Sequence, residues 1–232
     1  MALREIVLDT ETTGLDPATG DRLVELGCVE LLNSIPTGET FHRHIDPERE
    51  VPHEAFRIHG LSTEFLRGKP KFAEIASDFF EFIGESKLII HNAEFDLKFL
   101  NAELRRIEFP PLNSDRVVDT LALARRKHPG APASLDALCV RYGIDNSRRT
   151  KHGALLDSEI LAEVYLELTG GRQSALQLAS VGQTTRKIQL AVVDLVKMRP
   201  APLPQFLMTD ELTAHEKMLE SMGEKSVWRQ YR

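Results

Sequence analysis

Cysteines are scarce in this chain of 232 residues: there are two, Cys28 and Cys139, and they stand far apart. With no CxxC pair, neither a cysteine zinc site nor a disulfide framework is expected, and a reducing compartment is the default. Long apolar runs are also missing. None approaches the roughly 20 residues that span a bilayer, and the N-terminal "MALREIVLD" lacks the apolar core of a signal peptide. We therefore expect a cytoplasmic protein without a membrane partner.

The chain also lacks an excess of basic residues, since its net charge is −6 with 28% charged and 42% hydrophobic residues. Proteins that grip long nucleic acid without sequence preference usually carry a basic surface. If the substrate is nucleic acid, we expect this chain to touch only a short piece of it, or to rely on a partner for the rest. Internal repeats, a GxGxxG pattern and a P-loop pattern are absent from the sequence too.

The hydrophobic pattern predicts a mixed α/β sheet flanked by helices. Three strands with hairpin-like links come first, at 5–9, 22–33 and 39–46, with a turn in "SIPTG" at 34–38. Helices and strands then alternate, with strands at 87–92 and 116–120. Helices are expected at 71–85, 94–107 and 121–127, from the N-cap Ser134 onward, and at 153–168. Asp119 or Thr120 is expected to cap the helix that follows it.

The first domain is expected to end near Gly170-Gly171, and the rest of the chain to form a C-terminal extension. "RPAPLP" at 199–204 must be extended or turn-like because proline restricts the backbone. "TDELTAHEKMLESM" at 209–222 predicts a helix capped by Thr209 or Asp210.

Four acids stand where a buried surface is predicted. Asp9 and Glu11, in "VLDTETTG", follow a buried strand and point to one face because strand side chains alternate. Asp96 and Asp157 each stand four residues before a leucine of a buried helical stripe, at the leading end of the helix. A carboxylate there is costly unless it is paired, hydrogen-bonded or metal-bound. One such Asp could serve the helix dipole, but four together favour a divalent-metal site.

The donor type narrows the choice of metal. Carboxylates are hard oxygen ligands, which favour magnesium or manganese over zinc. Two such ions about 4 Å apart stabilise the attacking and leaving oxygens of phosphoryl transfer. His152 lies five residues before Asp157, too far round a helix to share its face, so we expect it in the preceding loop as a base for an attacking water. Arg148, Arg149 and Lys151 suit a phosphate backbone, or form a solvated loop.

Three motifs in order resemble the DEDDh group of 3′–5′ exonucleases, which have a ribonuclease H-like fold. They are "DTETTG", "HNAEFD" and "HGALLD". "EAFRIHGL", "SLDALCVRYGIDNSRRTKHGALLD" and "AEVYLELTGG" look in particular like the proofreading subunits of bacterial DNA polymerase III. The resemblance covers residues 4–171 and returns at "TDELTAHE" and the Trp-containing tail.

The resemblance implies a five-stranded ribonuclease H-like sheet with a C-terminal extension, and roles for particular residues. Two Mg²⁺ or Mn²⁺ ions would be bound by Asp9, Glu11 and Asp157, with Asp9 shared and Asp96 completing the site. His152 would be the general base. The substrate would be a DNA 3′ end, its terminal nucleotide contacted by Glu54 and His59 as well as by the metal ligands; from the residues alone, His59 reads as a loop residue and Glu54 as a helix-start acid.

The resemblance also implies a division of the chain. Residues 1–171 would form the exonuclease domain and 172–205 a linker. In that linker, 173–178 ("QSALQL") would bind the sliding clamp through Gln173, Leu176 and Leu178. Residues 206–232 would dock on the polymerase III alpha subunit. A small accessory subunit is left open. The long glutamine-rich linker of some relatives is absent, and "GQTTRKIQLAVVDLVKM" is apolar enough to pack.

Three alternatives remain beside a DNA proofreading exonuclease. An RNA 3′–5′ exonuclease of the same group would use the same catalytic residues, although the C-terminal segment favours DNA. A haloacid-dehalogenase-type phosphatase is disfavoured because its second acid is Asp where this chain has Glu11, and because His152 would have no role. A catalytically inactive adaptor between clamp and polymerase is disfavoured by the intact set of acids.

Overall fold

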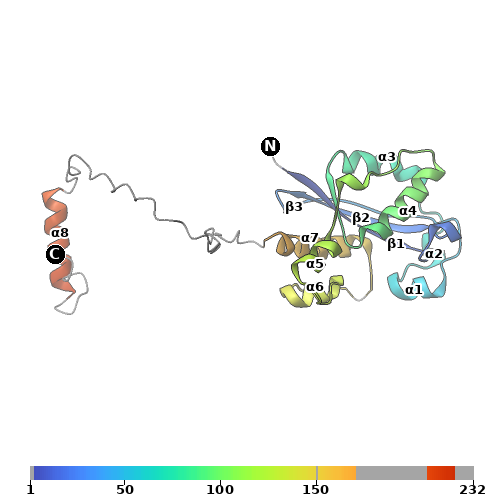
Figure 1. Cartoon of the computed structure of the whole chain (residues 1–232). Helices are drawn as coiled ribbons and strands as arrows, with labels where there is room; N and C mark the ends of the chain where they lie inside the picture. The colour runs from blue at the N-terminus through green and yellow to red at the C-terminus, as the bar shows by residue number, and fades with distance from the viewer. Residues whose placement is uncertain (1–2, 150, 171–207, 223–232) are drawn as a thin grey trace, which may run out of the picture. The chain divides into compact units, whose positions relative to one another are not determined.

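The computed structural model describes residues 3–149, 151–170 and 208–222 (Figure 1). They fall into two units, and each is described by itself. The first is built on a five-stranded sheet with the order β3-β2-β1-β4-β5. Its strands are β1 (Arg4–Thr12), β2 (Leu23–Leu32), β3 (Ile35–His44), β4 (Lys87–Ile90) and β5 (Val117–Asp119).

Helices connect and cover these strands. They are η1 (Pro17–Thr19), α1 (His53–His59), α2 (Thr63–Leu66), α3 (Phe72–Ile83), α4 (Ala93–Arg106), η2 (Ser114–Arg116), α5 (Thr120–Lys127), α6 (Leu135–Tyr142) and α7 (Ala154–Thr169). The second unit contributes α8 (Thr209–Ser221). The predicted mixed α/β fold is confirmed, and the predicted long helices match α3, α4 and α7 to within one or two residues. In the described part of the chain, no helix combines the length and apolarity that crossing a membrane requires.

The directions of the strands bring three strand ends together. β1 pairs antiparallel with β2, and β2 with β3. β4 runs parallel to β1, and β5 parallel to β4. Because parallel strands end at the same edge of a sheet, the carboxyl ends of β1, β4 and β5 share one edge. The residues that follow these ends are therefore the ones that the fold can combine into a site.

The hairpin between β2 and β3 differs from the prediction. The predicted turn at 34–38 is wrong: Leu32 pairs with Ile35, so the loop is only Asn33-Ser34. Both residues have positive φ, 51° and 64°, which fits the tight hairpin turn whose twist matches that of the flanking strands. Pro36 lies inside β3, where it is tolerated because β3 is an edge strand.

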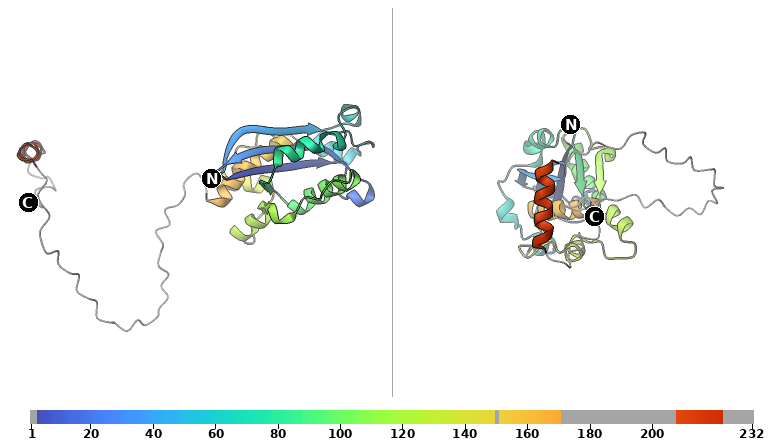
Figure 2. Two further views of the ribbon diagram at one scale, coloured as in Figure 1. Left: turned by 90° about the horizontal axis from the view of Figure 1, so that it is seen from above. Right: turned by 90° about the vertical axis from the view of Figure 1, so that its left-hand side faces the viewer.

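The sheet separates two layers of helices (Figures 1 and 2). Ile6 and Leu8 of β1 belong to a core with α3 and α4, whereas Val7 faces a second core with α7. Asp9 and Glu11 continue the Val7 face beyond the apolar part of the strand, since side chains alternate. The alternation therefore turns both acids toward the layer that contains α7.

A glycine allows α7 to approach the sheet closely. Gly27 of β2 lies opposite Asp9 in the strand register. A Cβ added at Gly27 would stand 2.3 Å from the backbone of Ala154 and Leu155, in the first turn of α7. The Ser158 hydroxyl also donates a hydrogen bond of 3.0 Å to the Gly27 carbonyl. The start of α7 is thereby held against β2, level with the acidic end of β1.

Helix caps mostly follow the predictions. Ser134 caps α6 by accepting the Ala137 N–H, and Asp119 caps α5 by accepting the Leu121 N–H. In the second unit, the predicted cap of α8 at Thr209 or Asp210 is wrong. Met208 occupies that position, and its N–H donates a hydrogen bond of 2.9 Å to the Glu211 carboxylate. An acidic side chain in the first turn thus replaces a capping side chain.

Candidate active site

Three elements bring the four predicted acids together at the edge where the parallel strands end. β1 carries Asp9 and Glu11, Asp96 lies in the first turn of α4 just after β4, and Asp157 lies in the first turn of α7. Glu11, Asp96 and Asp157 are buried, with 7%, 3% and 3% of their surface exposed. Three of the acids, Asp9, Glu11 and Asp96, line a cavity of about 690 Å³, together with His91, Asn92, Phe95, Arg149 and His152, among others.

Crowding and burial oppose the ionisation of these carboxylates. Burial, followed by the charge of Asp157, raises the pKa of Glu11 to about 8. Burial also raises the pKa of Asp96 to about 7, even though the Thr10 hydroxyl donates a hydrogen bond of 2.6 Å to it. The pKa of Asp9 is raised well above its ordinary value by burial and then by the charges of Asp96, Glu11 and Asp157. The cluster is short of positive charge, as expected of residues that hold a cation.

The donor set fits a divalent cation. Four carboxylates offer oxygen ligands, and one atom each of Glu11, His152 and Asp157 lies within 4.8 Å of the others. Hard oxygen donors suit Mg²⁺ or Mn²⁺. This assembly of acids from β1, α4 and α7 is the one that the spacing of the sequence predicted.

Arg149 supplies the nearest positive charge, a position that the sequence did not reveal. Its guanidinium donates to both oxygens of Asp157, at 2.5 and 2.8 Å, in the fork geometry of a strong ion pair. It also donates to Asp136 at 2.8 Å. Only 8% of the Arg149 side chain is exposed, and the adjacent carboxylates raise its pKa further. The sequence is compatible with a solvated loop or a phosphate contact for Arg149, and the structure places its side chain among the acids.

His152 lies just before α7, in the loop where the sequence placed it. Its Nδ1 is 3.5 Å from Asp157 and 2.8 Å from Nη2 of Arg149, and about half of its side chain is exposed. Because a guanidinium can only donate, Nδ1 must accept and the proton must sit on Nε2. Burial, and then the charge of Arg149, lowers the pKa of His152, which favours the neutral ring.

A second cavity, of about 520 Å³, adjoins the first. Its lining includes residues 10–15, which form the end of β1 and the start of the following loop. Phe95 of α4 and Glu54, Ala55, Ile58 and His59 of α1 complete most of the wall. Glu54 is exposed in the first turn of α1, whereas His59 is its last residue and is buried. His59 Nδ1 accepts the Leu61 N–H at 3.0 Å. Its Nε2 is buried without a hydrogen-bond partner among the described residues.

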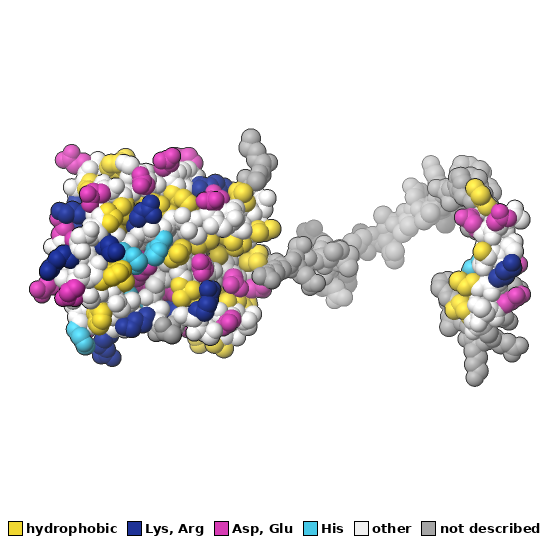
Figure 3. Space-filling model, turned by 180° about the vertical axis from the view of Figure 1, so that it is seen from behind, with side chains coloured by type: hydrophobic (Ala, Val, Ile, Leu, Met, Phe, Trp, Pro, Cys, Tyr) yellow, Lys and Arg dark blue, Asp and Glu magenta, His cyan; other side chains and the backbone are white. Residues whose placement is uncertain are grey.

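The remaining predicted site residues cannot be placed. Gln173, Leu176 and Leu178, predicted to bind the clamp, lie outside the described residues, as does the whole of the predicted linker at 172–205. On the face of the first unit seen in Figure 3, acidic and basic side chains are interspersed. This distribution agrees with the net charge of −6.

Known proteins resemble this chain over almost its whole length. A family model described as "Exonuclease" matches residues 6–165. The chain is 50% identical over 224 residues to the DNA polymerase III subunit epsilon of Rickettsia felis, covering 95% of this chain and 97% of that protein. It is 44% identical over 237 residues to the protein of the same name from Escherichia coli, covering 97% of each.

Solved structures share the fold. Exonuclease X in complex with 5′-overhanging duplex DNA superposes with a TM-score of 0.58 at 23% identity, covering 71% of this chain and 90% of that one. A 3′-exonuclease that recognises the histone mRNA stem-loop gives a TM-score of 0.63 at 16% identity, covering 73% of this chain and 65% of that one. At such identities the likeness concerns the fold alone.

Proposed function

The chain belongs to the exonuclease family, within which it is a member of the DNA polymerase III subunit epsilon family, and we propose that Asp9, Glu11, Asp96, Asp157 and His152 are its catalytic residues. Membership makes it a 3′–5′ exonuclease that proofreads DNA synthesis. The observation that supports the assignment of residues is the convergence of four carboxylates, two of them with pKa values raised to about 7 and about 8. Asp9, Glu11 and Asp96 line one cavity, and Asp157 lies beside Glu11 and His152.

The carboxylates would hold the metal ions that this type of exonuclease requires. We infer two Mg²⁺ or Mn²⁺ ions bound by Asp9, Glu11 and Asp157, with Asp96 completing the set. When bound, such ions lower the pKa of a water molecule and offset negative charge at the phosphate. Asp96 would be oriented by the Thr10 hydroxyl, which donates to it at 2.6 Å.

His152 would act as the general base. A base must lie within hydrogen-bond reach of the proton that it removes, and His152 stands at the rim of the acidic cavity with its Nδ1 3.5 Å from Asp157. Its lowered pKa keeps the ring neutral near pH 7, as a base requires. Arg149 now engages Nδ1, so this nitrogen becomes available only when the guanidinium moves away.

The second cavity would receive the 3′-terminal nucleotide of DNA. We propose that Glu54 and His59 contact this nucleotide, because both line the cavity. A terminal nucleotide must unstack to enter such a site, and a mismatch lowers that cost. This reasoning predicts a preference for frayed ends.

The rest of the chain would attach the exonuclease domain, residues 1–171, to its partners. We propose that residues 206–232, which include α8, dock on the polymerase alpha subunit. Residues 173–178 would bind the sliding clamp from within a linker at 172–205. The acidic net charge of −6 fits an enzyme whose partners hold the DNA.

Substrate choice tests the function. The full chain is incubated with Mg²⁺ and a primer–template with a 3′ mismatch, its matched counterpart, or single-stranded RNA. The proposal expects deoxynucleoside monophosphates, released fastest from the mismatch. Faster digestion of RNA would favour the RNA exonuclease, and no release from any substrate would favour the inactive adaptor.

Truncation tests the division of the chain. A chain ending at Gly171 should keep its exonuclease rate on short primers, since the acids and both cavities lie before that residue. It should no longer co-purify with the polymerase subunit. Retained co-purification would place the docking segment inside the exonuclease domain.

A further inference from the structure

A second group of possible metal ligands lies on the outer strands of the sheet. Glu11 of β1 is paired with Glu25 of β2, and Glu25 is paired with His44 of β3. His42 stands two residues before His44 and therefore shares its face. Glu11, Glu25 and His44 thus form a row across β1, β2 and β3. This row begins at a proposed catalytic acid and continues onto two strands that carry none of the proposed catalytic residues.

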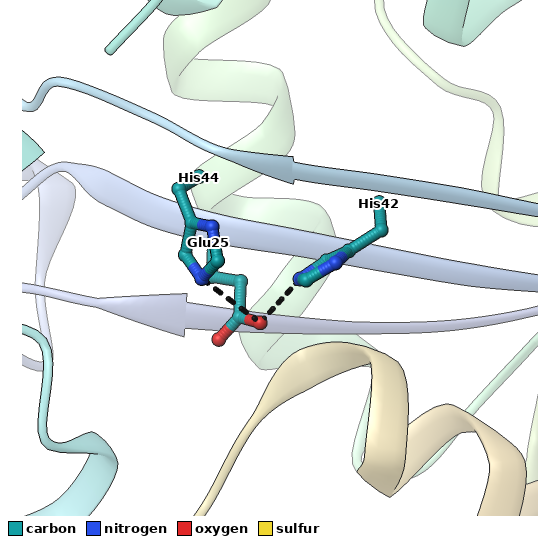
Figure 4. A group of neighbouring side chains, drawn as sticks. All are labelled: Glu25, His42 and His44. Atoms are coloured by element: carbon teal, nitrogen blue, oxygen red, sulfur yellow. Dashed lines mark hydrogen bonds and ion pairs between the residues drawn. The ribbon is translucent and has the colours of Figure 1, made fainter. Parts of the chain in front are cut away.

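The three side chains converge on one point, as Figure 4 shows. Nε2 of His42 lies 2.6 Å from Oε1 of Glu25, and Nε2 of His44 lies 3.7 Å from the same oxygen. One ligand atom from each residue lies within 4.8 Å of the other two. Glu25 is buried, while the side chains of His42 and His44 are 33% and 27% exposed. The cluster therefore has a buried carboxylate at its base and two partly exposed imidazole rings.

A structural ion pair accounts for only part of this arrangement. A buried carboxylate needs a partner, and His42 supplies one for Glu25. That pairing leaves His44 unexplained. Within the described residues the His44 ring makes no hydrogen bond, its nearest carboxylate oxygen being the one at 3.7 Å. It packs edge-on against Phe65, with ring centroids 5.0 Å apart, which turns its Nε2 toward Glu25.

We propose that Glu25, His42 and His44 form a second metal site, selective for Zn²⁺ and separate from the catalytic one. Two imidazoles and a carboxylate, with water in the fourth position, are a recurrent zinc ligand set. Ligand atoms at zinc distances in a tetrahedron stand about 3.3 Å apart. The separations of 2.6 and 3.7 Å therefore need to change by less than about 1 Å. Mg²⁺ prefers oxygen donors, so the two sites differ in selectivity.

The bound ion would join two strands. It would cross-link β2 to the edge strand β3, one strand away from Glu11. The ammonium of Lys69 lies 4.6 Å from the centroid of the Phe65 ring, against which His44 packs. Its charge opposes binding, so Lys69→Met should tighten the site. Zinc binding to the native state should also raise the melting temperature with increasing zinc concentration.

Calorimetric titration of Zn²⁺ into the full chain tests the site. Glu11, His152 and Asp157 could also take up zinc, so the titration uses Asp157→Asn as the background. One Zn²⁺ should still bind. Adding His44→Phe, which keeps a ring against Phe65, should weaken that binding at least about tenfold. His42→Gln, which keeps a donor for Glu25, should do the same. His128→Phe is the matched control, because His128 bonds Tyr142 and belongs to neither site.

The outcomes are distinct. Zinc binding that disappears with Asp157→Asn, or that is unaffected by both His44→Phe and His42→Gln, overturns the second site. Anomalous diffraction at the zinc edge should show a peak between the three side chains, and a peak only at the acidic cluster contradicts it. His44→Phe should keep full exonuclease activity in Mg²⁺, so the failure of this site leaves the proposed function standing.

Discussion

Replacing Arg149 with methionine should strengthen metal binding. The guanidinium donates hydrogen bonds to both oxygens of Asp157 and to Nδ1 of His152. We expect an ion bound by Asp157 to displace it. Methionine keeps much of the aliphatic packing and removes the charge, so the variant loses a contact that competes with the metal. The substitution destabilises the protein without metal but not the protein with metal bound. By linkage, the free energy of metal binding becomes more favourable by the same amount.

The size of the effect follows from the burial of the pair. Removing one partner of a buried ion pair costs about 3–5 kcal/mol. We take the lower end, because the third contact of Arg149 is to Asp136, whose side chain is 60% exposed. About 3 kcal/mol corresponds to about a hundredfold in an equilibrium constant. In a domain of this size it lowers the melting temperature of the metal-free protein by about 6–12 °C.

Titration with Mn²⁺, followed by calorimetry and by thermal melting, measures the Mn²⁺ affinity and the melting temperature. Arg149→Met should bind Mn²⁺ about a hundredfold more tightly than the wild type. The difference in melting temperature between Arg149→Met and the wild type should disappear at saturating Mn²⁺. Arg148→Met is the control, because the Arg148 side chain is 73% exposed and its one ion pair among the described residues, with Glu159 at 3.6 Å, lies at the surface. Unchanged or weaker Mn²⁺ binding in Arg149→Met would show that Arg149 does not compete with the metal and instead helps to organise the site.

Two further predictions concern stability. The raised pKa values of Glu11 and Asp96, about 8 and about 7, mean that the native state holds protons that the unfolded chain has released. The metal-free protein should therefore lose stability as the pH rises from the ordinary carboxyl range through these values. Melting curves in a chelator test this, and a melting temperature that climbs over the same range would contradict it. Separately, Gly27→Ala should destabilise the fold by about 1–3 kcal/mol or more, because its Cβ would stand 2.3 Å from the backbone of α7. Denaturant unfolding measures this, with Gly153→Ala, whose Cβ would meet nothing, as the control; equal stabilities would disprove the close approach.

Local periodicity is what made the acids predictable. Asp9 and Glu11 follow a strand of known face, and Asp96 and Asp157 extend two helical stripes by one turn. These patterns operate over a few residues, so no contact between distant segments was needed to read them. The ends of the main helices were predictable for the same reason.

Other features depend on how segments pair in space. The position of the β2–β3 turn is set by register, which places Asn33 and Ser34 in the turn even though "SIPTG" contains a proline and a glycine. The fork of Arg149 on Asp157 joins a loop to a helix eight residues away. The grouping of Glu25 with His44 needs the pairing of β2 with β3. A single sequence carries no direct signal for such contacts.

The release of mononucleotides by wild type and Asp157→Asn measures whether the acidic cluster catalyses the reaction. Both full-length proteins, shown to be folded by thermal melting, are given a primer with a mismatched 3′ end and saturating Mg²⁺. The account predicts that the wild type shortens the primer from its 3′ end and that Asp157→Asn is slower by at least about a hundredfold, because metal ions contribute several kcal/mol to such reactions. Asp115→Asn, a change at an exposed acid, should match the wild type. Equal rates for Asp157→Asn and the wild type would contradict the assignment of the acidic cluster as the catalytic site.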